Sequence, residues 1–283
     1  MQSVTYQSGG REITFSLSPP YIFEKAEGLH GMETLLLTSE SPWLDGTKVH
    51  SLRLPDRQIT LSFQIEGKDR ADMYKKRMEA MNVLRPEAGG DGRLVYRNDA
   101  GSWWIPALVK QAPTADGRQR NFNHCTVVFL CPDPYWRSME LAEASLGFQG
   151  GGLTFPIELG KLEFGEAEWG DMVRNEGDGP APLHIRVYGP AKGPKISKGL
   201  DAFIRVNTAL EEGESLDIYT GRGDASVTIN RKDGRKRSGF GYLDLDSVFF
   251  QLDPGWNLLR YDSDDDGVMT RVEVSYYSMF GGV

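Results

Sequence analysis

Regular alternation of apolar and polar residues most constrains the fold of this chain. It runs unbroken through residues 59–66, Ile-Thr-Leu-Ser-Phe-Gln-Ile-Glu, and Ile13, Phe15 and Leu17 repeat it near the start. Because successive side chains of a strand point to opposite faces, this pattern predicts strands that bury one face. Residues 102–109 and the apolar run 122–131 predict two more strands, the first of which sends Trp103 and Trp104 to opposite faces.

One segment of the first half follows a helical period instead. Its apolar residues step by three, four and three positions, which places them on one face of a helix. Asp69 suits the cap of the first turn, with Asp72 three residues later, and Pro86 stops the helix. We predict one helix over residues 69–85, packed on a sheet through Ala71, Tyr74, Met78 and Met81.

The pattern changes after Trp136. A glycine triplet at 150–152 suits a loop or linker, and turn residues separate short apolar segments beyond it. Eight short strands without a helical period predict an antiparallel β-sandwich. We therefore predict a mainly β protein with two domains, residues 1–136 with one α-helix and residues 137–283 as the sandwich. The expected sandwich strands are 154–159, 183–188, 202–206, 215–220, 226–230, 248–252, 257–261 and 270–277.

Charge and cysteine content narrow the class of protein. Residues 1–136 hold 16 Lys+Arg and 16 Asp+Glu, and residues 137–283 hold 16 and 24, so the net charge of −8 lies in the second half. An acidic chain is a poor match for direct nucleic-acid binding, which needs a basic face. Cys125 and Cys131 would lie about 20 Å apart on one strand, too far for a disulfide, so both are expected to be reduced.

Neither a membrane span nor a secretion signal is expected. No run of apolar residues reaches the length that crosses a bilayer. The first residues, Met-Gln-Ser-Val-Thr-Tyr-Gln-Ser-Gly-Gly, lack the apolar core of a signal peptide. We therefore expect synthesis in the cytoplasm and no membrane partner.

An acidic stretch near the end matches the pattern of a calcium loop. The ligand positions fall on Asp262, Asp264, Asp266 and Glu273, and hard carboxylate oxygens suit Ca²⁺. The flanking residues favour strands, however, whereas this loop type normally sits between helices. The alternative, and our preferred interpretation, is an acidic hairpin tip in solvent with Glu273 facing outward.

A second charged stretch has the opposite sign. It contains Arg231, Lys232, Arg235, Lys236 and Arg237 around Asp233-Gly234, a dipeptide typical of a type I′ hairpin. One interpretation is a solvated hairpin tip. The other is an electrostatic contact with an acidic surface, such as residues 262–266 of the same or a neighbouring chain. A separation of more than about 20 Å, two Debye lengths, would exclude that contact.

The sequence contains no catalytic or cofactor-binding motif. A nucleophile elbow, a phosphate-binding loop and a dinucleotide fingerprint are all missing, and the four histidines and two cysteines lack zinc spacing. We expect no enzyme activity, no cofactor and no favoured metal. Trp256, which follows Pro-Gly, is expected to be a buried sandwich residue; if exposed beside polar neighbours, it would suit stacking on a sugar.

Several segments, in this order along the chain, resemble the distal tail proteins of long-tailed, siphovirus-like phages and prophages. Residues 59–66, the predicted helix and residues 92–96 resemble a strand, helix and strand of that family. The resemblance continues through Cys-Pro-Asp-Pro-Tyr-Trp at 131–136 and residues 175–187, 227–230, 241–243 and 249–257.

The resemblance implies an amino-terminal belt domain that closes a hexameric ring and a galectin-like sandwich outside it. It further implies a virion structural protein at the tail tip, joined to the tail tube protein and to the tail hub or tail-associated lysin. Receptor-binding or baseplate proteins would attach to it, and DNA would pass through its lumen as cargo. The alternative function is a carbohydrate-binding, lectin-like module with an appended β-domain.

Overall fold

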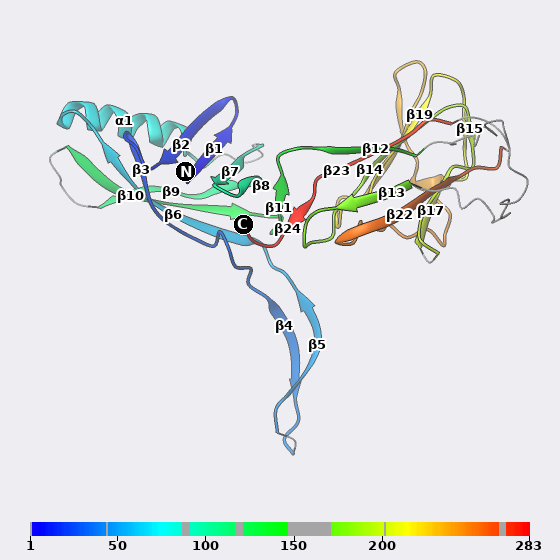
Figure 1. Ribbon diagram of the computed structural model, residues 1–283, viewed down its shortest axis with the longest axis horizontal. Helices are drawn as coiled ribbons and strands as arrows, with labels where there is room; N and C mark the ends of the chain where they lie inside the picture. Colours follow the sequence, from blue (N-terminus) through cyan, green and yellow to red (C-terminus); the bar gives the residue numbers. More distant parts are fainter. Residues whose placement is uncertain are drawn as a thin grey trace, which may run out of the picture. The chain divides into compact units, whose positions relative to one another are not determined.

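The computed structural model describes residues 2–43, 45–86, 91–116, 121–146, 171–200, 202–265 and 270–283 (Figure 1). The chain forms two compact units, and each is described by itself below. Unit 1 comprises residues 1–139 and 280–283, and unit 2 comprises residues 140–279. The division lies three residues beyond the expected one, and nothing in the sequence predicted that the last four residues return to unit 1.

Unit 1 is built on a ten-stranded sheet, here called the large sheet, in the order β24-β11-β8-β7-β1-β2-β3-β6-β10-β9. Antiparallel pairing dominates; a short parallel contact joins β2 to β3. The elements are β1 (Ser3–Ser8), β2 (Arg11–Ser16), β3 (Tyr21–Glu27), β4 (Leu35–Glu40), β5 (Thr47–Arg53), β6 (Arg57–Glu66), α1 (Arg70–Val83), β7 (Arg93–Asn98), β8 (Gly101–Pro106), β9 (Leu108–Asp116), β10 (Phe122–Cys131), β11 (Trp136–Ser138) and β24 (Met279–Phe280).

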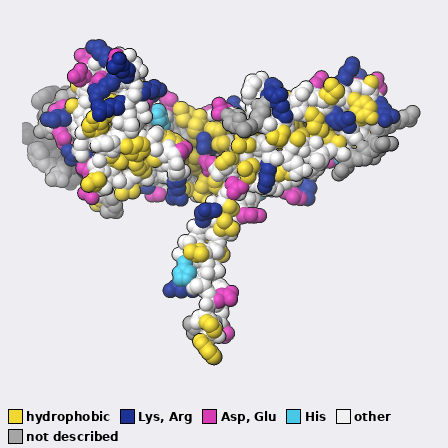
Figure 2. Space-filling model, turned by 180° about the vertical axis from the view of Figure 1, so that it is seen from behind, with side chains coloured by type: hydrophobic (Ala, Val, Ile, Leu, Met, Phe, Trp, Pro, Cys, Tyr) yellow, Lys and Arg dark blue, Asp and Glu magenta, His cyan; other side chains and the backbone are white. Residues whose placement is uncertain are grey.

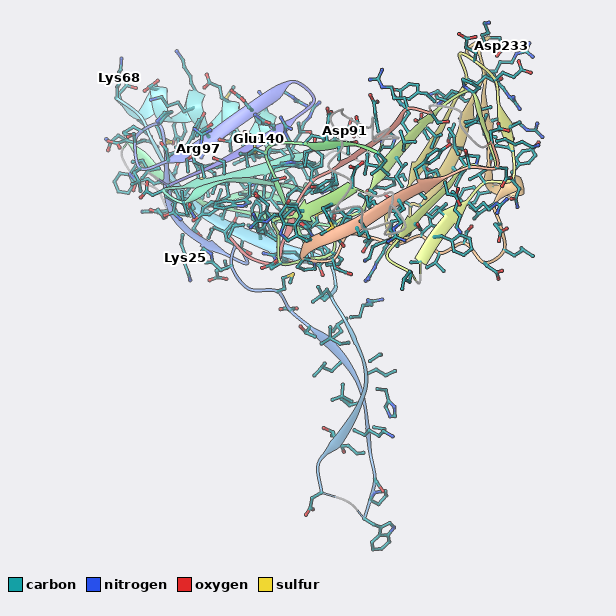
Figure 3. The ribbon with its side chains drawn as sticks, turned by 45° about the vertical axis from the view of Figure 1, so that its right-hand side comes forward. Lys25, Lys68, Asp91, Arg97, Glu140 and Asp233 are labelled. Carbon is teal, nitrogen blue, oxygen red and sulfur yellow. The ribbon has the colours of Figure 1, made fainter. Side chains whose placement is uncertain are left out.

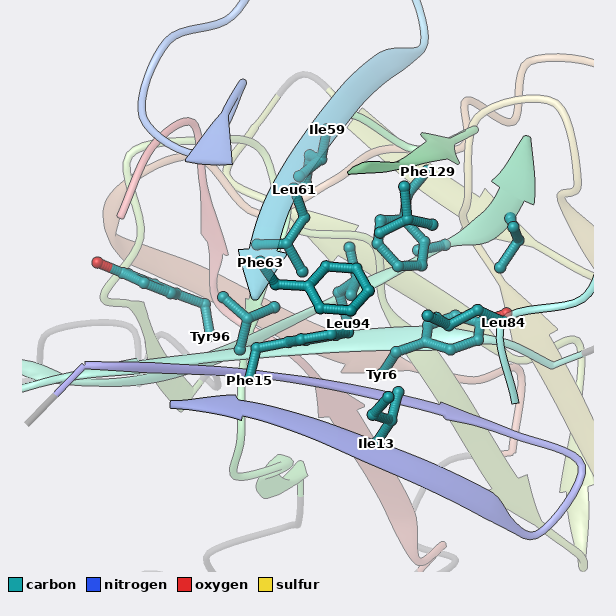
Figure 4. Close-up of a cluster of buried hydrophobic side chains, with 14 of the residues drawn as sticks. Tyr6, Ile13, Phe15, Ile59, Leu61, Phe63, Leu84, Leu94, Tyr96 and Phe129 are labelled. Carbon is teal, nitrogen blue, oxygen red and sulfur yellow. The ribbon is translucent and has the colours of Figure 1, made fainter. Parts of the chain in front are cut away.

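The alternating pattern builds the core of unit 1. Every second residue of β6 and β10 is buried, and the two strands pair along their whole length. The rings of Phe15 and Phe63 meet at 4.6 Å and those of Tyr6 and Phe129 at 5.0 Å between centroids (Figure 4). Side chains from strands distant in the sequence therefore fill one apolar interior.

The predicted helix exists, but it buries a different face from the predicted one. It begins after Asp69, whose carboxylate accepts a hydrogen bond from the Asp72 amide at 2.8 Å. Tyr74 and Met78 are exposed, at 37% and 64%. The predicted contact of these residues with the sheet is therefore wrong.

The buried face of α1 carries Met73 and Ala80, followed by buried Leu84 just past the helix end. Charged residues lie between them, which hid this face from the sequence pattern. Lys76 belongs to it because its aliphatic stem lets the amine reach the Glu66 carbonyl at 3.1 Å. On the exposed face, guanidinium groups cover the Tyr74 ring, with that of Arg77 4.9 Å from its centroid.

Two predictions about side chains in unit 1 are confirmed. Cys125 and Cys131 are both buried free thiols. Trp103 and Trp104 face opposite sides of β8: Trp103 packs against Phe280 at 6.2 Å between ring centroids, whereas Trp104 lies beneath the Arg137 guanidinium. The contact with Phe280 holds the returning chain end against the first unit.

Unit 2 is a β-sandwich of a six-stranded sheet, β12-β23-β14-β19-β20-β21, and a four-stranded sheet, β13-β22-β16-β17, with a two-stranded pair β15-β18. Alternate residues of the strands are buried, including Ile185, Ile218 and Leu259. The elements are β12 (Ala142–Leu146), β13 (Asp171–Asn175), β14 (His184–Tyr188), β15 (Ala191–Lys192), β16 (Lys195–Lys198), β17 (Ala202–Arg205), β18 (Ala209–Leu210), β19 (Ser215–Tyr219), β20 (Ser226–Asn230), β21 (Lys236–Ser238), η1 (Phe240–Tyr242), β22 (Gly255–Asp262) and β23 (Val272–Tyr276).

Six of the eight predicted sandwich strands correspond to strands of the structure. Residues 154–159 lie outside the described residues. Residues 248–252 do not form a strand; only an isolated bridge between Ala181 and Leu252 occurs there. Val248 is 55% exposed whereas Phe250 is buried, so the apolar run follows an irregular path along the sandwich.

The described residues contain no helix long and apolar enough to cross a membrane; α1 spans 14 residues and carries several charges.

Candidate assembly interface

A two-stranded arm, β4 and β5, extends from unit 1 away from the large sheet (Figure 1). Every residue of both strands is exposed. An isolated two-stranded hairpin is marginally stable in water. Within its own unit, the arm therefore has little packing to stabilise it.

The arm carries apolar side chains on both of its faces. Leu36 pairs with Leu52 on one face, and Leu35 and Leu37 point to the other. Side chains project from both sides of the ribbon, and apolar atoms mark its length and its end (Figures 2 and 3). The exposed fractions are 49% for Leu35, 53% for Leu36, 63% for Leu37, 93% for Trp43, 54% for Val49 and 64% for Leu52. Exposed apolar side chains gathered on one element are typical of an interaction surface.

The root of the arm is fixed by close backbone packing. Gly28 follows β3 with φ +85°, and a Cβ placed there would lie 2.2 Å from the Gln58 carbonyl oxygen. Only glycine allows both this φ and this approach. The next residue, Leu29, is buried, and the Trp136 ring N–H donates to its carbonyl at 3.1 Å.

Arg57, at the start of β6, completes the root. Its Nη1 donates to the carbonyls of Gly28 at 2.9 Å and Leu29 at 2.8 Å, and its Nη2 donates to that of Gly281. The side chain is almost fully buried. One guanidinium thus connects both ends of the arm to the chain terminus and holds the arm on a rigid base.

The calcium-loop residues do not gather in the structure. Asp264 accepts two hydrogen bonds from Arg205 Nη2, at 2.8 and 2.9 Å, while Glu273 lies on the six-stranded sheet, bonded to Tyr188 and Arg271. Asp262 lies at the end of β22, and Asp266 is outside the described residues. Among described residues, no acidic, histidine or cysteine cluster could hold a metal.

The basic stretch forms the β20–β21 hairpin, with Asp233 at its end (Figure 3). The predicted type I′ turn is wrong, because that turn needs positive φ at two central residues and only Gly234 has one, at +80°. A three-residue loop ending in this glycine closes the hairpin instead.

Two of the basic residues form ion pairs with acidic residues of the same unit. Arg231 pairs with Glu214 at 2.9 Å, and Arg235 lies 3.4 Å from Asp233. Lys236 and Arg237 lie on exposed β21, and Lys232 is in the loop before it. Asp264 binds Arg205 rather than the basic hairpin, and contact between the basic stretch and residues 262–266, within one chain or with a neighbouring chain, stays a prediction.

Trp256 is exposed, at 63%, so the expectation of burial is wrong. It points outward from β22 because Asn257, the next residue, faces the interior. Arg174, opposite Trp256 on β13, has its guanidinium 5.7 Å from the centroid of the tryptophan ring. Met172, also on β13, is 56% exposed. The Trp256 surface is thus apolar with a basic neighbour.

Sequence reasoning missed the arm altogether. A signal was present: Leu35-Leu36-Leu37 places apolar residues at consecutive positions among polar ones. In a strand, consecutive residues face opposite sides, so this run fits no sheet with one solvated face. In the structure this run lies on a ribbon with both faces exposed within the chain.

Two family models match separate parts of the chain. The model of the phage tail protein RIFT-related domain matches residues 8–131, which include the arm and its root. The model of the siphovirus-type tail component, C-terminal domain, matches residues 176–280. No protein among those of curated function matches the sequence.

Solved structures share the fold over the entire length. The Dit protein of phage SPP1, described as a paradigm of the hub adsorption apparatus in phages that infect Gram-positive bacteria, matches with a TM-score of 0.69 and 13% identity, over 98% of this chain and 99% of that one. A chain of the phage P2 baseplate in its activated conformation matches with a TM-score of 0.56 and 12% identity over both full lengths. The strontium-bound form of that baseplate gives a TM-score of 0.57 with the same identity and coverage. From the two domain models and the common fold, the chain belongs to the distal tail proteins of siphovirus-type phages.

Proposed function

We propose that copies of this chain close into a hexameric ring at the tip of a phage tail, with the arm of each copy covered by its neighbours. The carrying observation is the fully exposed arm, which bears apolar side chains on both faces above a rigid root. Identical subunits that contact head to tail form a closed ring when the rotation between them closes. An arm on each copy supplies such a contact.

The free energy available from the arm supports a cooperative assembly. Covering the exposed parts of these six apolar side chains, at roughly 1 kcal/mol each, releases about 6 kcal/mol. Association of two proteins costs about 4–15 kcal/mol in lost freedom of motion. The arm alone gives weak pairing, and a closed ring, in which every copy makes two contacts, is favoured over open chains.

Electron microscopy of the purified protein tests the ring directly. We expect six-membered rings with a central hole. Replacing Leu36 and Leu52, which pair on one face of the arm, by serine should abolish the rings while leaving the circular dichroism spectrum unchanged. Leu200→Ser, at a site in unit 2 that is 90% exposed, is the matched control and should leave rings intact. Rings that persist in the arm variant would contradict the role of the arm.

We further propose that the ring joins the tail tube to the tail hub, with DNA passing through its lumen, and that unit 2 anchors receptor-binding or baseplate proteins. This rests on the family and on the division into two units. Immunogold labelling of intact particles should place the protein at the tail tip. Label along the whole tail or on the capsid would exclude that position.

A further inference from the structure

The outer face of the six-stranded sheet carries an organised set of polar side chains. Strand register puts Ser145, Glu273, Arg186 and Asp217 in one row across four strands. All four belong to the outward-facing positions that alternate with buried residues. The row therefore presents hydrogen-bonding groups side by side on a rigid support.

Hydrogen bonds fix Arg186 of β14 and Asp217 of β19 within this row. Arg186 donates to both carboxylate oxygens of Asp217, at 2.5 and 3.1 Å. Asn230 donates to the same carboxylate at 2.8 Å and to the Ser215 hydroxyl at 3.0 Å. Burial alone would raise the pKa of Asp217, but the bonds from Arg186 and Asn230 outweigh it and lower the pKa. The guanidinium is thus held in one orientation.

A second set of contacts fixes Glu273. The Tyr188 hydroxyl donates to its carboxylate at 2.7 Å, and Arg271 donates to the other oxygen. These bonds lower the pKa of Glu273. The Arg271 guanidinium also lies 5.0 Å from the Tyr188 ring centroid, which holds the tyrosine in place. Glu273, a ligand position only in the less favoured calcium-loop interpretation, is an ionised and oriented hydrogen-bond acceptor.

Between β12, β23 and β14 this face is hollowed. The hollow has a volume of about 430 Å³, within the range of about 300–1,000 Å³ typical of small-molecule sites. Its polar lining comes from Glu143, Ser145, His184, Arg186, Glu273 and Ser275. Ala144 and Val274 complete the lining, which is mainly polar because most large apolar residues of these strands face the sandwich interior.

The lining selects a class of ligand. Arg186 donates, the carboxylates of Glu143 and Glu273 accept, and the serine hydroxyls do both. An apolar ligand would displace water from these groups without offering hydrogen bonds in return, and a polyanion would meet two carboxylates. A neutral ligand with several neighbouring hydroxyl groups satisfies donors and acceptors together. The Trp256 surface, on the other sheet, meets the condition for stacking on a sugar, because the exposed ring has Arg174 beside it; it offers fewer hydrogen-bonding groups than the hollow.

We propose that this hollow is a saccharide-binding site, in which Arg186 and Glu273 hydrogen-bond adjacent hydroxyl groups of a neutral sugar. Glu143 and the two serines contact the rest of the ring. The proposal does not depend on ring formation, since all the lining residues belong to one unit of a single chain.

The test is a glycan array probed with the purified full-length chain, followed by NMR titration with the best-bound mono- or disaccharide. We expect millimolar or tighter binding to at least one neutral glycan. Glu143→Ala, at an exposed position, and Glu273→Gln, which keeps the side-chain shape, should each weaken it at least tenfold. Ser226→Ala, on the same sheet outside the hollow, and Trp256→Ala should leave binding unchanged.

Three results would overturn the proposal. They are absence of binding to every neutral glycan, binding that survives both hollow variants, and binding that is lost in Trp256→Ala but kept in Glu143→Ala. The last result would move the site to the other sheet. Because the titration can be done with monomers or with rings, a failure to bind sugar is distinguishable from a failure to assemble.

Discussion

Replacing Arg57 by methionine should cost unit 1 about 3 kcal/mol of folding free energy. The guanidinium is buried and donates to three backbone carbonyls, those of Gly28, Leu29 and Gly281. A hydrogen bond from a charged donor contributes roughly 1.5–3 kcal/mol, so the three together contribute about 5 kcal/mol. The methionine variant no longer buries a charge or the Arg57 Nε, which has no hydrogen-bond partner, and this offsets about 2 kcal/mol of the loss.

Thermal unfolding measured by near-ultraviolet circular dichroism checks this estimate. For a unit of this size, about 3 °C is lost per kcal/mol, so the transition of unit 1 should fall by about 10 °C. The two units are followed as separate transitions, because a protein of two units need not unfold in one step. Arg235→Met, at an exposed guanidinium, is the control and should shift the transition by less than about 2 °C.

A double-mutant cycle tests the contact with the chain end. Deleting residues 281–283 removes the Gly281 carbonyl that Arg57 binds. If the contact matters, the deletion and Arg57→Met together should cost less than the sum of their separate costs, by about 1 kcal/mol or more. Full additivity, or an Arg57→Met protein as stable as the parent, would refute the reasoning.

Three further predictions concern single sites. Gly28→Ala should cost at least about 2 kcal/mol more in urea unfolding than Gly10→Ala, because both glycines have positive φ but only Gly28 meets a carbonyl at 2.2 Å; equal costs would disprove the clash. Both thiols are buried, and burial raises the pKa of Cys131 to about 12, so at pH 8 iodoacetamide should modify either cysteine only after unfolding; labelling of native protein would count against this. The pKa of Asp217 is lowered in the folded state, so its ionised form stabilises the fold above its unfolded pKa of about 3.9. This stability is lost as the pH falls through the folded pKa. Asp217→Asn should therefore flatten the dependence of unfolding free energy on pH in that acidic range, and an unchanged profile would contradict the role of the pair with Arg186.

Properties that depend on residues close together in the sequence could be predicted from the sequence. The alternation at 59–66 produced β6, and the helix begins at the cap that Asp69 provides. The mainly β class and the sandwich followed from many short strands, because strand periodicity and turn residues are local signals. The reduced state of the two cysteines followed from their spacing along one strand.

Other properties depend on what each side chain meets in three dimensions. The helix turns Met73 rather than Met78 inward, because the large sheet approaches from that side and Lys76 can extend its amine past the apolar contact. Trp256 faces outward because of the register of β22, which pairing with a distant strand sets. The polar hollow is likewise built from three strands that only the sheet order brings together.

The arm shows most clearly the difference between what the sequence predicts and what the tertiary structure decides. Its leucines are apolar, and the general preference for burying apolar residues would place them in a core. The tertiary structure instead leads the chain out of the large sheet at Gly28 and back at Arg57, so that both faces of the hairpin stay open. The sequence by itself determined the strands with a regular alternation, such as β6 and β10. Only the tertiary structure decided which strands find partners within the chain, because pairing is a long-range property of the folded backbone.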